Sequence, residues 1–174
     1  MAEALVAGSP RASGLTGPAA ARLIALLLPA ALLGGALGSQ YLGGLHPCEM
    51  CYWQRWPHAA AILLAALSFT QPAASGRARS LTLLAALAIA ISGAIGVYHA
   101  GVEAKIFEGF TTCTAMGKGL STAELLKQIS AAPLVRCDEV QFRFLGISMA
   151  GWNAILSLGG AALIVTLSLR AKRA

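Results

Sequence analysis

Two cysteines separated by two residues, Cys48 and Cys51, form the stretch of this 174-residue chain with the clearest chemical potential. A Cys-x-x-Cys pair supports thiolate formation and rapid thiol–disulfide exchange, above all at the start of a helix. Arg55 follows Cys51 by one helical turn and could stabilise a thiolate, or negative charge developing on a reducible ligand. The alternative role for Arg55 is interfacial anchoring beside Trp53 and Trp56.

Two further cysteines, Cys113 and Cys137, bring the total to four. Four cysteines allow three connectivities, and their spacing alone does not choose among them. A static disulfide between the distant two would leave the close pair unexplained, and a closed metal site would require four soft ligands. We expect no metal, because Cys113 and Cys137 show no paired spacing of their own.

His99 and Glu103 lie four residues apart at the end of an apolar run. On one helix face they could orient a polar ligand or relay a proton. Equally, they could be interfacial polar residues that mark the end of a helix. His46 and His58 flank the cysteine pair, and for both we expect no part in the chemistry.

The composition indicates the elements that must position these residues. Apolar residues make up 57% of the chain and charged residues 11%, whereas soluble domains carry about a quarter charged residues. The pattern predicts an all-α polytopic membrane protein, a four-transmembrane-helix bundle. The expected spans cover about residues 21–42, 51–70, 81–100 and 147–169 of a single domain, 21–174, which follows a disordered tail, 1–20.

The first and second spans each have an alternative. The first run could be a cleaved signal peptide, although its apolar character continues past the possible cleavage site. For the second, a start at Pro57 leaves only about 14 residues, too few to cross, whereas a start near Cys51 suffices. We therefore predict a helix that begins at or just after the cysteine pair, with Pro57 as a kink. The alternative places Pro57 first, after a loop over 48–56.

Small residues in two runs could let helices approach closely: Gly34 and Gly38 in the first, Gly93 and Gly96 in the third. Between the third and fourth runs lies a large polar loop, 101–146. Within it Ser121 and Glu124 have capping-box spacing ahead of apolar residues, which predicts a short amphipathic helix, on the membrane surface or packed on its own loop.

The charges predict the orientation. Four spans place both termini on one side, which then carries Glu3 and these basic residues: Arg11, Arg22, Arg77, Arg79, Arg170, Lys172 and Arg173. On the other side basic and acidic residues balance. The positive-inside rule makes the termini cytoplasmic and places all four cysteines on the exported side, where disulfides persist. The net charge of +6 therefore reports membrane topology, and a nucleic-acid role is not expected.

These residues resemble a known family. Pro47-Cys48-Glu49-Met50-Cys51 with Arg55, four spans and a second cysteine pair in the large exported loop resemble the DsbB family. Three further segments extend the resemblance over nearly everything after the tail: Cys137-Asp138-Glu139, Phe144-Leu145-Gly146-Ile147-Ser148 and Trp152-Asn153. Members are bacterial inner-membrane proteins that reoxidise the periplasmic disulfide donor DsbA.

The resemblance implies roles for individual residues. Cys113 and Cys137 would form a loop disulfide that the reduced donor attacks, with Cys113 as the expected site of the mixed disulfide. Cys48 and Cys51 would form the membrane-proximal disulfide that takes over the electrons. Cys51 would face a quinone, ubiquinone or menaquinone, which Arg55 polarises. His99 or Glu103 would be a further polar residue on the quinone side.

The expected function is thus a quinone-dependent protein-disulfide oxidase in the inner membrane, with a DsbA-like periplasmic protein, the quinone and the bilayer as partners. Two alternatives stay open. One is a non-enzymatic membrane protein that uses the same thiols for metal binding or sensing. The other is a specialised paralogue that serves one dedicated partner.

Overall fold

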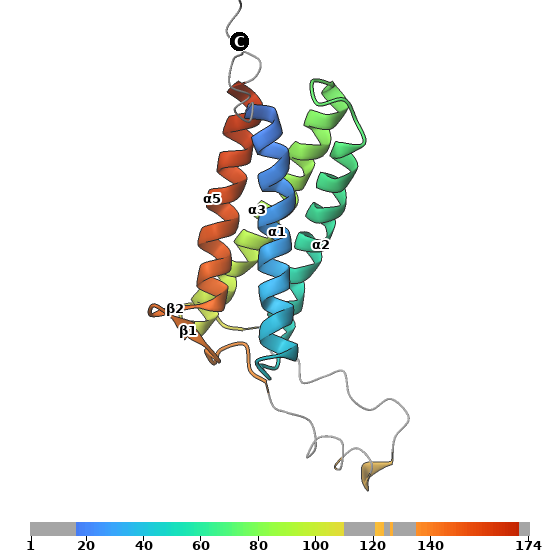
Figure 1. Ribbon diagram of the computed structural model, residues 1–174. Helices are drawn as coiled ribbons and strands as arrows, with labels where there is room; N and C mark the ends of the chain where they lie inside the picture. Colours follow the sequence, from blue (N-terminus) through green and yellow to red (C-terminus); the bar gives the residue numbers. More distant parts are fainter. Residues whose placement is uncertain (1–16, 110–120, 124–125, 127–134, 171–174) are drawn as a thin grey trace, which may run out of the picture.

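Four long helices form an antiparallel bundle in a computed structural model that describes residues 17–109, 121–123, 126 and 135–170 (Figure 1). They are α1 (Gly17–Tyr41), α2 (Glu49–Phe69), α3 (Gly76–Glu103) and α5 (Met149–Arg170). The start of α1, the end of α5 and the α2–α3 turn lie at one end of the bundle (Figure 1). The start of α2 and the end of α3 lie at the other.

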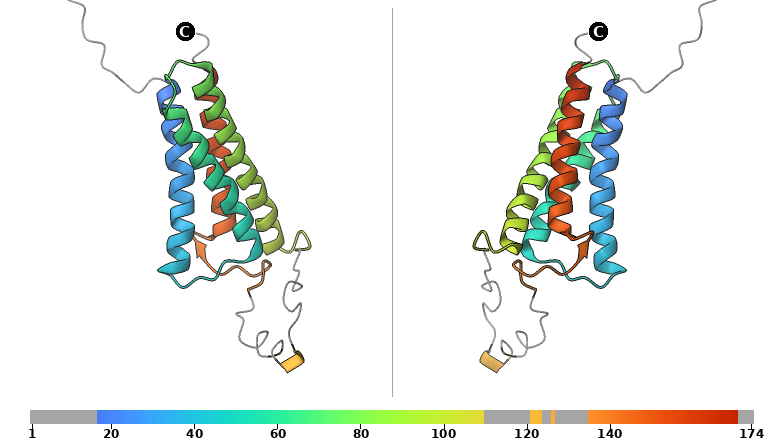
Figure 2. Two further views of the ribbon diagram at one scale, coloured as in Figure 1. Left: turned by 90° about the vertical axis from the view of Figure 1, so that its right-hand side faces the viewer. Right: turned by 90° about the vertical axis from the view of Figure 1, so that its left-hand side faces the viewer.

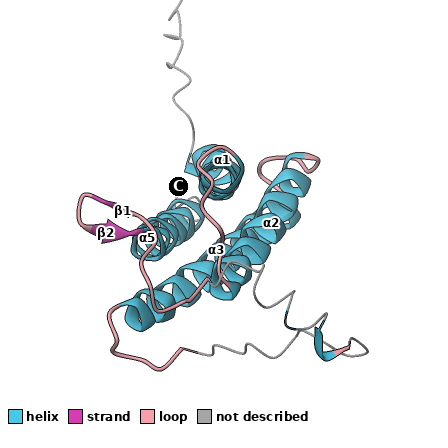
Figure 3. Cartoon of the chain, turned by 90° about the horizontal axis from the view of Figure 1, so that it is seen from below, coloured by secondary structure: helices cyan, strands magenta, loops and turns pink. Residues whose placement is uncertain are grey.

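The helices pack as a ring of four. α3 packs along both α2 and α5, and α1 packs along the same two helices from the opposite side (Figures 2 and 3). The shared core consists mostly of alanines with a few branched residues, including Ala25, Ala61, Ala85, Ile89 and Ile164. Such small side chains allow the close helix approach that membrane bundles use in place of a large hydrophobic core.

Two glycines of α3 confirm the predicted close-packing face. A Cβ at Gly96 would lie 3.1 Å from the backbone oxygen of Ala150 and from the nitrogen of Ala154, so α3 and α5 touch backbone to backbone there. Gly93 lies equally close to α5. In contrast, a Cβ at Gly34 or Gly38 of α1 would meet nothing within 4 Å in the described chain, so these two glycines mark no helix contact.

The outward faces are apolar, as the membrane prediction requires. Large side chains such as Leu63, Leu87 and Ile155 are more than half exposed, where a soluble bundle would present polar residues. Three helices, α1, α3 and α5, are long and apolar enough to cross a membrane. α2, which carries Gln54 and Arg55, is not among them, so the fourth crossing stays a prediction.

The cysteine pair lies at the start of α2. Cys48 is the N-cap residue with extended backbone angles, and the helix begins at Glu49, so Cys51 lies in its first turn. Pro57 lies inside the helix, as predicted, and the alternative start at Pro57 is wrong. α2 thus begins two residues earlier than the span expected from Cys51.

Other helix bounds also differ from the expected ones. α1 begins at Gly17, so part of the expected tail is helical, with Pro18 in the first turn where proline is tolerated. α3 begins at Gly76, five residues before the expected start at 81, because the Ser75 side chain accepts a hydrogen bond from the Ala78 amide at 3.1 Å. It ends at Glu103, three residues beyond the expected end at 100.

A small hairpin precedes α5 and was not predicted. Strands β1 (Arg143–Phe144) and β2 (Ile147–Ser148) pair antiparallel across Leu145 and Gly146, both with positive φ. Two central residues with positive φ are typical of a type I′ turn, which matches the twist of a hairpin. The span expected from residue 147 therefore starts as a helix only at Met149.

Some expectations fall on residues that the structure does not describe. The N-terminal tail up to residue 16 is one, and Cys113 is another. Thr122, Ala123 and Leu126 are helical, but the rest of the predicted amphipathic helix lies outside the described residues.

Candidate functional site

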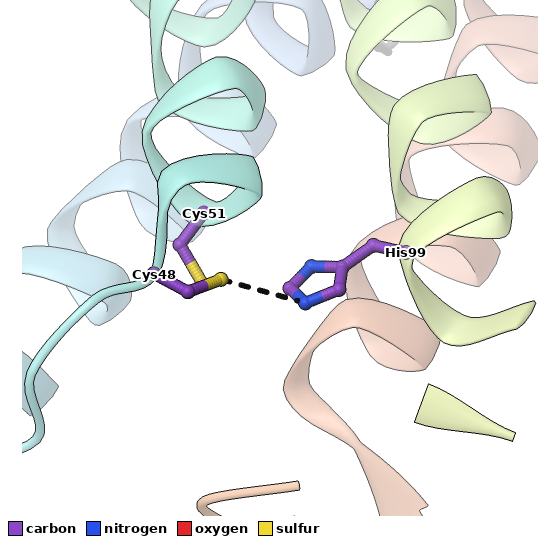
Figure 4. A group of neighbouring side chains, drawn as sticks. All are labelled: Cys48, Cys51 and His99. Carbon is purple, nitrogen blue, oxygen red and sulfur yellow. Dashed lines mark hydrogen bonds between the residues drawn. The ribbon is translucent and has the colours of Figure 1, made fainter. Parts of the chain in front are cut away.

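The Cys-x-x-Cys pair is held by the first turn of α2. The backbone oxygen of Cys48 accepts hydrogen bonds from the Cys51 and Tyr52 amides at 3.1 and 3.3 Å, which places both cysteine side chains on one side (Figure 4). Their sulfurs lie 3.2 Å apart, with Cys48 donating to Cys51. A disulfide needs an S–S distance of about 2.05 Å, so this pair closes with little backbone movement.

The two thiols differ in their surroundings. The pKa of the Cys48 thiol is raised to about 12, first by its hydrogen bond to Cys51 and then by burial. Cys48 therefore keeps its proton and shares it with Cys51, whose sulfur lies near the positive end of the α2 dipole and one turn from Arg55. This asymmetry makes Cys51 the better nucleophile of the pair.

His99 of α3 faces the pair from across the site (Figure 4). Its Nε2 lies 3.5 Å from the Cys48 sulfur, and its Nδ1 lies 2.8 Å from Gln54 Nε2. Because Gln54 Nε2 also donates to the Met50 oxygen, this atom is the amide nitrogen and donates to His99 Nδ1. The remaining His99 proton is then on Nε2, directed at the Cys48 sulfur, which accepts it while donating its own proton to Cys51.

Glu103 lies further out than His99. Its Oε1 is 3.9 Å from His99 Nε2, and its side chain is 10% exposed. Glu103 lines a small hollow beside the cysteines but not the larger cavity described below, whereas His99 lines both. The pair predicted from its spacing does share one face, and of the two His99 is the residue that faces the larger space.

Cys137 is distant in the sequence but lies against the Cys48–Cys51 pair. It is 4% exposed and packs in one buried cluster with Cys48, Met50 and Val102. Burial raises the pKa of the Cys137 thiol to about 11. The structure thus joins one cysteine of the distant pair to one of the close pair, while Cys113 lies outside the described residues.

An ionic clamp holds the Cys137 segment against the end of α3. Lys105 Nζ donates to the Asp138 backbone oxygen at 2.9 Å and to its carboxylate, and Arg136 donates two hydrogen bonds to the same carboxylate. These two cations hold the pKa of Asp138 well below its usual range, Arg136 contributing first. The clamp lies directly beside Cys137 in the sequence, so it sets the position of that thiol.

Arg55 bridges α2 to α1. Its guanidinium donates to the Gln40 side chain and to the Ala36 oxygen, and its Cζ lies 5.0 Å from the centre of the Tyr52 ring. Its buried Nε has no partner, and no carboxylate pairs with it among the described residues. The cation is therefore positioned by neutral groups and keeps its charge available to a ligand.

A cavity of about 600 Å³ opens beside these residues, between α1, α2 and α5. Its walls are mainly apolar, with Leu32, Leu33 and Trp152 among them. Cys51, Arg55 and His99 line the same cavity. An apolar cavity with a few convergent polar groups is the usual form of a site for a small organic molecule.

A buried polar network that the sequence analysis missed continues from Gln54 into the bundle. Asn153 Nδ2 donates to Gln54 Oε1 at 2.8 Å, and Asn153 Oδ1 lies 2.9 Å from His58 Nε2. Ser92 lies 3.0 Å from the same His58 nitrogen. His58, for which no part in the chemistry was expected, is 3% exposed and belongs to this network. The signal was present, because polar residues inside apolar spans are uncommon and usually functional.

Known proteins resemble this chain over most of its length. A family model described as "Disulfide bond formation protein DsbB" matches residues 18–167. Disulfide bond formation protein B of Methylococcus capsulatus is 33% identical over 144 residues, which cover 79% of this chain and 85% of that protein. The namesake in Chromohalobacter salexigens is 32% identical, covering 76% and 80%. No solved structure matches.

A helical bundle with membrane-spanning helices and a Cys-x-x-Cys pair packed against a third thiol defines a class, the multi-pass membrane thiol–disulfide oxidoreductases. The family match completes the assignment. This chain belongs to the DsbB family of disulfide bond formation proteins.

Proposed function

We propose that this protein reoxidises a periplasmic DsbA-like dithiol protein and passes the electrons through two cysteine pairs to a membrane quinone. The observation that carries the proposal is one arrangement of sulfurs. Cys137 is buried against Cys48, and Cys51 lines an apolar cavity of about 600 Å³. One site therefore offers a route by which electrons could pass from a loop thiol to a lipid-soluble acceptor.

The sulfur chemistry balances at each exchange. A donor dithiol reduces the loop disulfide, Cys113–Cys137 in the proposed pairing, and leaves as a disulfide. The loop thiols then reduce the Cys48–Cys51 disulfide, moving the same two electrons inward. The packing of Cys137 against Cys48 favours this second exchange, because thiolate attack on a disulfide requires the sulfurs in contact.

The residues around the cavity fit a quinone. A bound quinone would supply the acceptor for the two electrons and two protons that leave the thiol pair. The apolar walls suit the ring and tail, while Arg55 and His99 would hold the ring oxygen nearest Cys51. DsbA-type oxidants have reduction potentials of about −120 mV, so their reoxidation requires a strongly oxidising final acceptor.

The proposed topology has four membrane crossings, with both termini cytoplasmic and the cysteine end periplasmic, in the bacterial inner membrane. Support comes from the antiparallel bundle, which brings the start of α1 and the end of α5 to the end opposite the cysteines (Figure 1). That end carries Arg22, Arg77, Arg79 and Arg170, as the positive-inside rule requires of a cytoplasmic end.

The function is tested with purified protein, a reduced DsbA-like donor and a soluble short-tailed ubiquinone. Cys48→Ser and Cys51→Ser should each abolish quinone reduction. Trp56→Phe, a change at a neighbouring side chain that is 74% exposed, should leave the rate unchanged. Retained turnover in either cysteine variant would sink the proposal.

The donor contact has its own test. In Cys137→Ser the Cys113 thiol has no loop partner, so the donor is supplied with a single cysteine activated as a mixed disulfide with thionitrobenzoate. Cys113 displaces the thionitrobenzoate thiolate, and the Cys113–donor disulfide should accumulate on non-reducing gels because neither the loop nor the donor retains a second thiol to resolve it. In Cys113→Ser it should not form. A donor adduct that persists without Cys113 would reassign the site of attack. A panel of donors that yields an adduct with only one of them would identify a dedicated paralogue.

Metal binding is the second candidate, because Cys48, Cys51 and His99 place possible ligand atoms within 4.8 Å of one another. Thiol titration of denatured, unreduced protein separates the two. The oxidase predicts no free thiols and no bound metal. Four free thiols with stoichiometric zinc would establish the metal protein instead.

A further inference from the structure

The wall of the large cavity includes a histidine that the proposed electron path does not use. His58 lines this cavity together with Cys51 and Arg55. The three residues follow one another at four and three positions along α2, so they form one stripe on one helix face. From Cys51 to His58 the helix rises by about 10 Å.

The hydrogen bonds around His58 determine which of its ring nitrogens carries the proton. Asn153 Nδ2 donates to the Ser92 backbone oxygen at 3.2 Å and to Gln54 Oε1 at 2.8 Å, so the amide orientation is fixed and Oδ1 faces His58. Ser92 Oγ donates its only proton to the backbone oxygen of Gln54 at 2.8 Å. Both atoms next to His58 Nε2 are therefore acceptors, and Nε2 must carry the proton.

The other nitrogen, Nδ1, is consequently a hydrogen-bond acceptor. It is buried and has no hydrogen-bond partner among the described residues. A buried acceptor without a donor is costly, and here the residue that carries it borders a cavity large enough for a ring. A ligand that supplies an O–H group at this depth would satisfy it.

We propose that His58 Nδ1 accepts a hydrogen bond from a ring hydroxyl of the reduced quinone, on the side of the ring remote from Cys51. This inference rests on the proposed function. A para-diol ring carries hydroxyls at opposite ends, and the stripe on α2 offers two polar groups one turn apart on the cavity wall, Arg55 nearer to Cys51 and His58 further along the helix.

The contact distinguishes the two redox forms of the ring. A quinone presents only carbonyl oxygens, which are acceptors, and neutral His58 offers no donor at Nδ1. The reduced form presents hydroxyls, which donate. His58 thus binds the product of electron transfer in preference to the substrate and draws electrons from the thiol pair. The proposal adds no redox step, since the two electrons and two protons that leave the dithiol both enter the ring.

The test measures binding without turnover, in a Cys48→Ser/Cys51→Ser parent that transfers no electrons. Decylubiquinol and decylubiquinone are titrated separately, and quenching of tryptophan fluorescence reports binding, since Trp152 lines the cavity. In His58→Gln the glutamine amide nitrogen replaces the imidazole Nε2 as the donor to Asn153. The variant has no acceptor at the position of Nδ1. It should bind the quinol about tenfold more weakly, the effect of one hydrogen bond, and the quinone within about twofold of the parent.

Ser157→Ala is the matched control. Ser157 belongs to the same network through its 3.0 Å bond to Asn153 Oδ1 but does not line the cavity, so neither affinity should change. His58→Gln that binds both forms like the parent would overturn the inference, as would an equal loss for both forms. A parent that binds neither form would overturn the quinone site of the proposed function together with it.

Discussion

Arg55 offers the sharpest quantitative test, because its charge is held by neutral partners one turn from Cys51. Side chains four residues apart on a helix approach to about 6 Å, where unit charges at an effective dielectric constant of about 20 interact by about 3 kcal/mol. Arg55 is only half-buried, so water and salt reduce this to about 1.5 kcal/mol. Loss of the charge should therefore lower the reactive thiolate population of Cys51 about tenfold.

The assay is iodoacetamide alkylation at fixed pH and ionic strength, in a variant whose only cysteine is Cys51. Arg55→Met should slow alkylation about tenfold. Arg55→Lys retains the charge but not the paired bonds to Gln40 and Ala36, so it should slow alkylation no more than about threefold. If Arg55→Met reacts within twofold of its parent, the charge does not act on Cys51 and the electrostatic reasoning is wrong.

Two other regions make testable predictions. Gly96→Leu should lower the free energy of unfolding by about 1–3 kcal/mol, because a Cβ at this position would already lie 3.1 Å from the backbone of α5. In the control, Gly34→Leu, the added Cβ meets nothing within 4 Å, so the melting temperature should not change. Asp138→Asn should release the ionic clamp and raise the alkylation rate of Cys137 severalfold at pH 7, whereas Glu139→Gln, which loses only a 3.7 Å contact, should not. Arg136 and Lys105 lower the pKa of Asp138. The clamp is therefore intact above the ordinary carboxyl range near pH 4 and is lost as the pH falls below that range. Cys137 in the wild type should accordingly become more accessible only in strong acid.

The sequence predicted the bundle because α1, α3 and α5 each leave a local trace, an apolar run of spanning length. The start of α2 was also predictable, since the length needed to cross a membrane favoured a start near Cys51 over one at Pro57. The hairpin before α5 was not, because strands of two residues are too short to show alternation. Its only trace is Gly146, whose positive φ the turn requires.

The candidate site was predictable in part for a similar reason. Cys48, Cys51 and Arg55 share one turn or adjacent turns of α2, so their spacing determines their relative positions. The contact between Cys137 and Cys48 depends on how the described end of the loop returns to the bundle, and spacing does not encode that return. The network of Gln54, His58 and Asn153 joins α2 to α5 and depends on how both helices are rotated about their axes.

The glycines of α1 bear on how an electron acceptor would reach the cavity. Gly35 lines the large cavity, and the positions of Gly34 and Gly38 carry no packing contact within 4 Å in the described chain. No side chain projects from this stretch of the wall, and in the proposed topology α1 would border the lipid there. An electron acceptor that enters through this wall comes from the lipid bilayer. The concentration that determines its binding is then its mole fraction in the lipid. Turnover should then fall when vesicles are enlarged with inert lipid at constant total quinone, and should be unaffected when the surrounding buffer is diluted.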